Sequence, residues 1–173
     1  MFGPLAQLAE QFPLKEAVAG SIPAWPIFSF PKKGFPQMKP YRIFGHTADI
    51  GIDVRGKTPE DVFINSAKAM FEIIADTSGI KSLKKVKIAK HAPDYDELLR
   101  EWLSELHYLY SVKQIVFGEF VIKELNDKII KAIAFGQKLS YNKIKTEIKA
   151  VTYHELEFRK TPEGYAARVI FDV

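Results

Sequence analysis

At His46-Thr47-Ala48-Asp49-Ile50-Gly51-Ile52, polar side chains run directly into a β-strand pattern. From Ile50 to Arg55 apolar and polar residues alternate, which is the period-two signature of a half-buried strand. Asp49 therefore lies at the start of this strand. The strand that follows can hold its carboxylate rigidly while the carboxylate oxygens face solvent or an ion. The residues alone also allow a plainer interpretation, in which Asp49 closes a turn and His46 is a surface residue.

Length and composition favour a single globular domain. The chain has 173 residues and 47% hydrophobic residues, enough for one sizeable core but not for two. It has no cysteine, which excludes disulfides, thiolate metal sites and cysteine nucleophiles. Any bound metal must therefore be held by oxygen or by histidine nitrogen. No apolar run is long enough to cross a bilayer and no secretory signal is visible, so we expect a cytoplasmic protein without a membrane partner.

Residues 1–37 differ from the rest of the chain because six of the ten prolines lie there, too densely for a packed helix or a central strand. We expect this segment to be a disordered leader. It also resembles a translation of the D and T arms of a transfer-RNA gene, which would make it a mis-assigned start and Met38 the true one. The domain itself is predicted to span residues 38–173.

Two helices are predicted inside that domain. The first begins at Thr58-Pro59-Glu60-Asp61, with an N-cap, a proline in the first helical position and acids in the first turn. The second begins at Pro93-Asp94, with Glu97 spaced as the other half of a capping box. Both carry apolar stripes at helical spacing, and Trp102 falls in the second stripe as a core residue. The stripes consist of Val62, Phe63, Ala67, Met70, Phe71 and Ile74, and of Leu98, Leu99, Trp102, Leu103, Leu106 and Leu109.

Most other segments favour strands. The predicted strands cover residues 41–45, 50–56, around 86–88, 115–125, 128–136, 148–154, 156–160 and 165–173. Asn126-Asp127 and Thr161-Pro162-Glu163-Gly164 have turn composition, and Leu139–Lys145 reads as a polar loop. The fold class is therefore α+β, with two helices packed on one mixed, mostly antiparallel, multi-stranded sheet.

Two groups of lysines stand out against a modest net charge of +4. Neither group is interleaved along the chain with the aromatic residues that stack on bases, so we interpret both as solvated surface and not as an RNA footprint. The groups are Lys81, Lys84, Lys85, Lys87 and Lys90, and Lys138, Lys143, Lys145 and Lys149.

The chain end is predicted to be held in a strand. Val169, Ile170 and Phe171 form a strongly strand-forming run up to Asp172-Val173, so the α-carboxylate of Val173 should be fixed in place. If Asp49 were nearby, the three groups would offer hard anionic oxygens suited to Ca²⁺, Mg²⁺ or Mn²⁺. The residues themselves do not show that these groups are close.

Three segments, in order, resemble the archease family. His46 to Ile52 is similar to its opening signature, whereas Lys149 to His154 and Arg168 to Val173 are similar to its closing ones. The likeness covers Met38 to Val173, and three matches in sequence are more specific than one.

The resemblance implies a metal site. The aspartate of the opening motif, the penultimate aspartate and the terminal residue bind a divalent ion in that family, and these positions are Asp49, Asp172 and Val173 here. We expect Ca²⁺ first, with Mg²⁺ or Mn²⁺ as alternatives. His46 and His154 lie in the matching motifs, and we expect them only to support the site because imidazole is a poor partner for calcium. Gly45 stands where relatives often carry an acid, so the ion should be held less tightly.

The resemblance also implies a function. Archeases are accessory proteins without a reaction of their own, so no catalytic residue is expected. They activate the RtcB-type tRNA-splicing ligase by promoting its guanylylation and repeated turnover, and tRNA would be reached only indirectly through that ligase. Two alternatives stay open: a small metal-dependent hydrolase of nucleotides or RNA, with His46 or His154 as general base, and a general protein chaperone.

Overall fold

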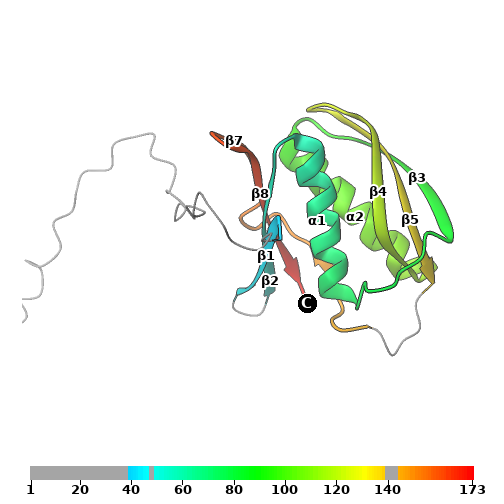
Figure 1. The fold of residues 1–173 in the computed structure, drawn as a ribbon. Helices are drawn as coiled ribbons and strands as arrows, with labels where there is room; N and C mark the ends of the chain where they lie inside the picture. The colour runs from blue at the N-terminus through cyan, green and yellow to red at the C-terminus, as the bar shows by residue number, and fades with distance from the viewer. Residues whose placement is uncertain (1–38, 47–48, 139–143) are drawn as a thin grey trace, which may run out of the picture. The chain divides into compact units, whose positions relative to one another are not determined.

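The computed structural model describes residues 39–46, 49–138 and 144–173, with only the backbone described at His46. The leader predicted over residues 1–37 lies outside the described residues, as does most of the predicted loop Leu139–Lys145. The described part forms two helices and eight strands (Figure 1). Neither helix combines the length and the apolar character that crossing a bilayer requires.

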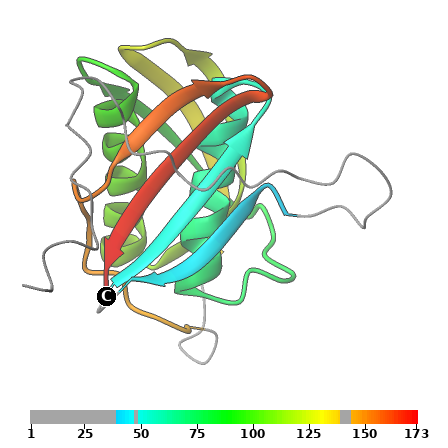
Figure 2. The ribbon, with the colours of Figure 1, turned by 90° about the vertical axis from the view of Figure 1, so that its left-hand side faces the viewer.

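Five of the strands make up the first sheet. Its order is β1-β2-β8-β6, with β7 also paired to β8, and all of these pairs are antiparallel. Figure 2 shows β2 and β8 running side by side through its centre. The bounds are β1 Tyr41–His46, β2 Asp49–Gly56, β6 Ala150–Val151, β7 Glu157–Thr161 and β8 Gly164–Asp172.

The second sheet has three antiparallel strands in the order β3-β5-β4. They are β3 Lys84–His91, β4 Ile115–Leu125 and β5 Ile129–Lys138. The predicted hairpin turn between β4 and β5 is confirmed, and Asn126 Oδ1 closes it by accepting the N–H groups of Lys128 and Ile129, both at 2.9 Å. An asparagine side chain thus replaces backbone partners in this turn.

Both helices begin as predicted. In α1 (Pro59–Ile74), Thr58 Oγ1 accepts the N–H of Asp61 at 3.2 Å and Asp61 Oδ2 accepts the N–H of Thr58 at 3.1 Å, which completes a capping box. In α2 (Tyr95–Lys113), Asp94 Oδ1 accepts the N–H of Glu97 at 2.9 Å. Glu97, the predicted second half of a box, instead turns its carboxylate to Arg100. These caps satisfy backbone donors that the first turn leaves unpaired.

The helices lie between the two sheets, and this arrangement places the core (Figure 1). Helix α1 contacts β2 of the first sheet and β4 of the second. All six residues of its predicted stripe are fully buried, and Ser66, Ala69 and Ile73 are buried as well. A helix buried on more than one side needs apolar or small residues around most of its circumference.

The α+β class and the two helices are confirmed, but the strands form two sheets where the sequence predicts one. The helices separate β3, β4 and β5 from the others, because both sheets need an apolar layer to cover them. The strand predicted over residues 148–154 is also much shorter. Ile148 is buried with its carbonyl oxygen bonded to His107 Nε2 at 2.6 Å, and β6 covers only Ala150–Val151, although the N–H groups of Lys149 and Thr152 also donate to β8.

Asp96 ties the start of α2 to β7, and this contact predicts a pH-dependent stability. Its Oδ1 accepts the N–H of Phe158 at 2.5 Å. Burial raises the pKa of the Asp96 carboxyl, helped by the nearby charges of Asp94 and Glu97, although the bond from Phe158 opposes the rise. A raised carboxyl pKa means that the folded state binds protons more tightly than the unfolded state, so stability falls as pH rises between the ordinary and the raised value.

Asp96→Asn should therefore be no less stable than the wild type at pH 7, because the amide keeps an acceptor for Phe158 and carries no charge. Asp96→Ala leaves that N–H unpaired and should lower the free energy of unfolding by about 1–3 kcal/mol. Urea unfolding at pH 4 and pH 7 measures both variants. An asparagine variant as unstable as the alanine one at pH 7 would contradict this account.

Candidate functional site

Two aspartates face each other at one end of the first sheet. Asp49 is the first residue of β2 and Asp172 the last of β8, and they are direct partners in the register. Directly opposed residues share a sheet face and hold their Cβ atoms about 4.5–5.5 Å apart. Like charges in this position repel each other. A positive charge beside the two aspartates would therefore stabilise them.

The chain end lies beside this pair. Figure 2 shows the C-terminus next to the end of β1 and the start of β2. The backbone N–H of Lys149 donates to the carbonyl oxygen of Asp172 at 2.8 Å, and the Val173 side chain packs against the core. The last residue is thus held in place and not frayed. We call Asp49, Asp172 and the α-carboxylate of Val173 the acidic tip.

Lys149 supplies a positive charge to the acidic tip. Its ammonium donates to the Val173 backbone oxygen at 2.8 Å and lies 3.8 Å from Asp172 Oδ1. The Lys149 side chain is 64% exposed, so this ion pair is worth little and can be broken cheaply. The sequence predicts Lys149 only as a solvated lysine, and this contact is not part of that prediction. Its position in the closing motif, beside the residue that pairs with Asp172, was the available signal.

The two predicted supporting histidines occupy different places. His46 is the register partner of Asp49, so its backbone lies beside the acidic tip. His154 lies in the connection between β6 and β7, where its Nε2 is 4.0 Å from Glu155 Oε1. Glu155 in turn pairs with Arg168, which lies four residues before Asp172 on β8. His154 is therefore not in register with the acidic pair, and its supporting role stays a prediction.

Ion pairs cross the outer face of the first sheet behind the acidic tip. Asp53 accepts from Arg42 at 2.6 Å and from Arg168 at 2.8 Å, and Arg168 also donates to Glu155 at 3.0 Å. Burial alone would lower the pKa of the Arg168 guanidinium, but Asp53 and Glu155 outweigh it and raise that pKa. Arg168 thus stays charged, and Asp53 links β2 to β8 through Arg168 and to β1 through Arg42.

Gly51 has a packing reason to be glycine. The Phe44 ring from β1 covers it, and a Cβ added at Gly51 would lie 2.3 Å from that ring and 2.8 Å from Ile170 Cδ1. The guanidinium groups of Arg42 and Arg168 lie 5.4 Å and 5.2 Å from the same ring centroid. The glycine of the opening motif therefore lets an aromatic ring lock β1 onto β2 and β8 just behind the acidic tip.

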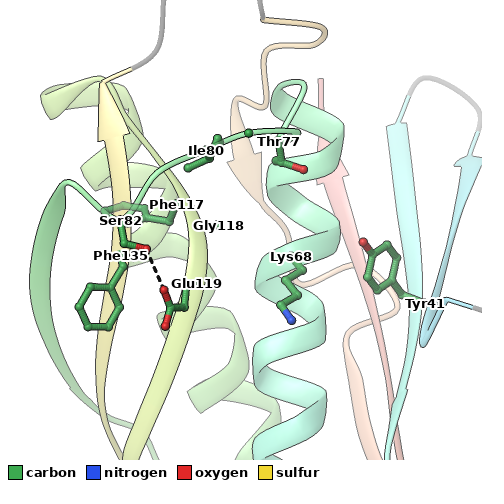
Figure 3. Close-up of a pocket in the computed structure, with 10 residues that line it drawn as sticks. Tyr41, Lys68, Thr77, Ile80, Ser82, Phe117, Gly118, Glu119 and Phe135 are labelled. Atoms are coloured by element: carbon green, nitrogen blue, oxygen red, sulfur yellow. Dashed lines mark hydrogen bonds between the residues drawn. The ribbon is translucent and has the colours of Figure 1, made fainter.

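A cavity of about 260 Å³ lies beside α1, away from the acidic tip (Figure 3). Lys68 of α1 and Glu119 of β4 line it, and Ser82 Oγ donates to Glu119 Oε2 at 2.7 Å. Tyr41, at the start of β1, forms another wall and donates to Glu72 Oε2 at 2.7 Å. Burial and the Glu72 carboxylate raise the pKa of Tyr41, so its hydroxyl stays protonated. The acidic tip lies at the other end of β1 and takes no part in this cavity.

The donors of the acidic tip fit a hard divalent cation. Two carboxylate side chains on adjacent strands and a fixed α-carboxylate provide the oxygen ligands that Ca²⁺, Mg²⁺ and Mn²⁺ accept. In the described residues no three His, Asp or Glu side chains converge on one point. A site with three protein ligands at the acidic tip would therefore use the α-carboxylate of Val173 as the third ligand, and Lys149 would have to move aside.

Comparisons with known proteins agree with this architecture. The model of the Archease protein family matches residues 41–173. The chain is 43% identical to protein archease of Methanosarcina barkeri over 143 residues, which cover 79% of this chain and 98% of that protein. It is 34% identical to protein archease of Pyrococcus furiosus over 142 residues, covering 79% of this chain and all of that one.

Two solved structures are similar in fold. The solution structure of a Methanobacterium thermoautotrophicum protein superposes with a TM-score of 0.67 at 34% identity, covering 79% of this chain and 100% of the other. The crystal structure of a Thermotoga maritima archease, described as a possible chaperone, gives a TM-score of 0.54 at 22% identity over 75% and 94% of the two chains, a likeness of fold alone. The family match and the two curated relatives establish that this chain belongs to the archease family.

Proposed function

We propose that this chain is a non-catalytic activator of the RtcB-type tRNA-splicing ligase, acting in the cytoplasm through the acidic tip. Membership of the archease family supports the proposal. The observation that carries it is the register of β2 and β8, which sets Asp49 directly against Asp172 beside the chain end. Lys149 offsets the repulsion between these aspartates only through an exposed ion pair with Asp172, so a divalent ion between the two carboxylates would stabilise the arrangement further.

The acidic tip would hold a divalent ion, Ca²⁺ first and Mg²⁺ or Mn²⁺ as alternatives. Such an ion, when bound, neutralises charge beside a triphosphate during nucleotidyl transfer. This chain's part is to present the carboxylates rigidly. Asp49 and Asp172 end strands that pair along their whole length, and Phe44 locks those strands together over Gly51. A rigid end of a sheet can reach into a partner's nucleotide pocket without rearranging.

The direct test is guanylylation of the cognate ligase with labelled GTP, with and without this protein. Wild type should raise both the rate and the number of turnovers. Asp49→Ala and Asp172→Ala should each abolish the stimulation while staying folded. Glu163→Ala is the matched control, because Glu163 is an exposed acid in the turn that begins β8, at the other end of the same strand. It should activate fully. Complete activation by an Asp49→Ala, Asp172→Ala double variant would overturn the role of the acidic tip.

The same preparation separates the alternatives. A metal-dependent hydrolase would hydrolyse GTP or RNA without the ligase, whereas an activator turns nothing over alone. A general chaperone would protect unrelated unfolded proteins from aggregation and would do so without Asp49 and Asp172. The Thermotoga relative is described as a possible chaperone, which is a reason to measure protection against aggregation. Stimulation restricted to the ligase and lost with the acidic tip separates an activator from both.

A further inference from the structure

The second sheet has one face against the helices and one face turned away from them (Figure 1). On β3 the inward position Ile88 is only 5% exposed, and its partner Ala132 on β5 is only 3% exposed. Since side chains alternate along a strand, Lys85 and Lys87 point to the opposite face. We call this face, formed by the outward residues of β3, β5 and β4, the outer face of the second sheet.

Lys85 and Lys87 place positive charge on the outer face, where Glu119 of β4 is the nearest acid across β5. Strand β3 carries Lys84, Lys85, Lys87 and Lys90 and no acid. Lys90 points the other way and pairs with Glu105 of α2 at 2.7 Å. Within the described residues, Lys84, Lys85 and Lys87 are exposed and take part in no ion pair. Lys85 and Lys87 are two residues apart, which spaces their Cα atoms by about 6.6 Å along the strand.

An aromatic ring lies among these lysines. Phe135 of β5 is the register partner of Lys85, and Ile133 is the partner of Lys87. Phe135 is half-buried and also lines the cavity beside α1, and Figure 3 shows its ring pointing away from Lys68. On the next strand, Glu119 lies opposite Phe135 and Val121 lies opposite Ile133. The lysines are exposed, as predicted, and the strand pairing brings them together with an aromatic residue that is far away in the sequence.

We propose that the outer face of the second sheet binds single-stranded RNA directly, with the Phe135 ring stacking on a base and Lys85 and Lys87 contacting phosphates. A sheet face that carries an aromatic ring beside cations is an arrangement on which unstacked bases are bound. Glu119, held by Ser82 at 2.7 Å, can accept from an exocyclic amino group. An acidic polypeptide would use the lysines but would gain little from the ring. This proposal does not rest on the acidic tip, which lies on the other sheet.

The test is fluorescence anisotropy of a labelled mixed-sequence single-stranded RNA 12-mer against the full-length protein at several salt concentrations. Phe135→Leu should weaken binding about tenfold, whereas Phe135→Tyr should keep it because the ring remains. A Lys85→Gln, Lys87→Gln double variant should reduce the slope of log affinity against log salt by about 1.4. The matched control is Lys57→Gln, Lys160→Gln, which removes two exposed lysines outside the second sheet and should change neither quantity. Circular dichroism melts verify that each variant is folded.

Each result decides the proposal. Selective loss in Phe135→Leu and in the Lys85, Lys87 double variant supports it, including when ligase activation is unchanged. Absence of RNA binding by the wild type at low salt overturns it. Equal losses in the Lys57, Lys160 control would show diffuse charge attraction and also overturn it. The proposal likewise fails if poly-glutamate binds as tightly as RNA and Phe135→Leu binds like the wild type, since the outer face would then be an acceptor for acidic protein.

Discussion

Replacing Trp102 by alanine should lower the free energy of unfolding by about 3–5 kcal/mol. The side chain is 0% exposed. Its Nε1–H donates to the carbonyl oxygen of Phe63 at 3.1 Å, which links α2 to α1, and its ring meets that of Phe120 on β4 edge-on at 6.0 Å. One residue thus joins both helices to the second sheet, and its removal leaves a cavity that the surrounding layers cannot close.

Urea unfolding monitored by circular dichroism measures this effect. Trp102→Phe keeps most of the buried ring area but loses the donor to Phe63, so its loss should be smaller than that of alanine. Tyr108→Ala is the matched control on the same helix, because that ring is 55% exposed, and it should change stability by no more than about 0.5 kcal/mol. If Trp102→Ala unfolded at the same urea concentration as wild type yet lost ligase activation, Trp102 would be functional and not core.

Local signals predict much of this fold because their physics is local. Thr58 and Asp94 cap the helices at the predicted residues, since a cap depends only on the few residues that follow it. The hairpin between β4 and β5 turns at Asn126 for the same reason. Trp102 is buried as its helical register predicts.

The division into two sheets could not be predicted in this way. Helix α1 reads as having one core-facing stripe, yet Ala69 and Ile73 outside that stripe are buried too. Small and apolar residues outside a stripe can equally well be exposed, so only the partners of the strands reveal that α1 has a sheet on each side. Strand pairing between distant segments depends on the whole core and not on any one window of sequence.

The candidate site divides in the same manner. That Val173 ends a strand-forming run was predicted, and the structure holds it by Lys149 and by packing. The approach of Asp49 to Asp172 joins the beginning and the end of the domain, and neither composition nor spacing measures that distance. Only the resemblance to the archease family predicted that Asp49 lies near Asp172. Nothing in the sequence predicted that Phe135 would lie opposite Lys85.

The second large effect concerns the acidic tip. In chelator, Asp49→Ala and Asp172→Ala should be no less stable than wild type, because each removes one of two like charges that face each other. Added Ca²⁺, Mg²⁺ or Mn²⁺ should stabilise the wild type by mass action, by about 2.7 kcal/mol at a concentration of 100 times the dissociation constant. Both variants should lose this gain. Thermal melts in chelator and across a metal titration measure it.

Three further variants isolate the source of that gain. Two residues added after Val173 should mimic the aspartate variants, because they remove the α-carboxylate from its place beside Lys149. Lys149→Gln should bind the ion more tightly than wild type, since no ammonium then competes for Asp172 and Val173. Glu163→Ala should keep the full metal-dependent shift. If an Asp49→Ala, Asp172→Ala double variant were stabilised by these ions as much as the wild type, the carboxylates would not hold the cation. Their opposition across β2 and β8 would then need another cause.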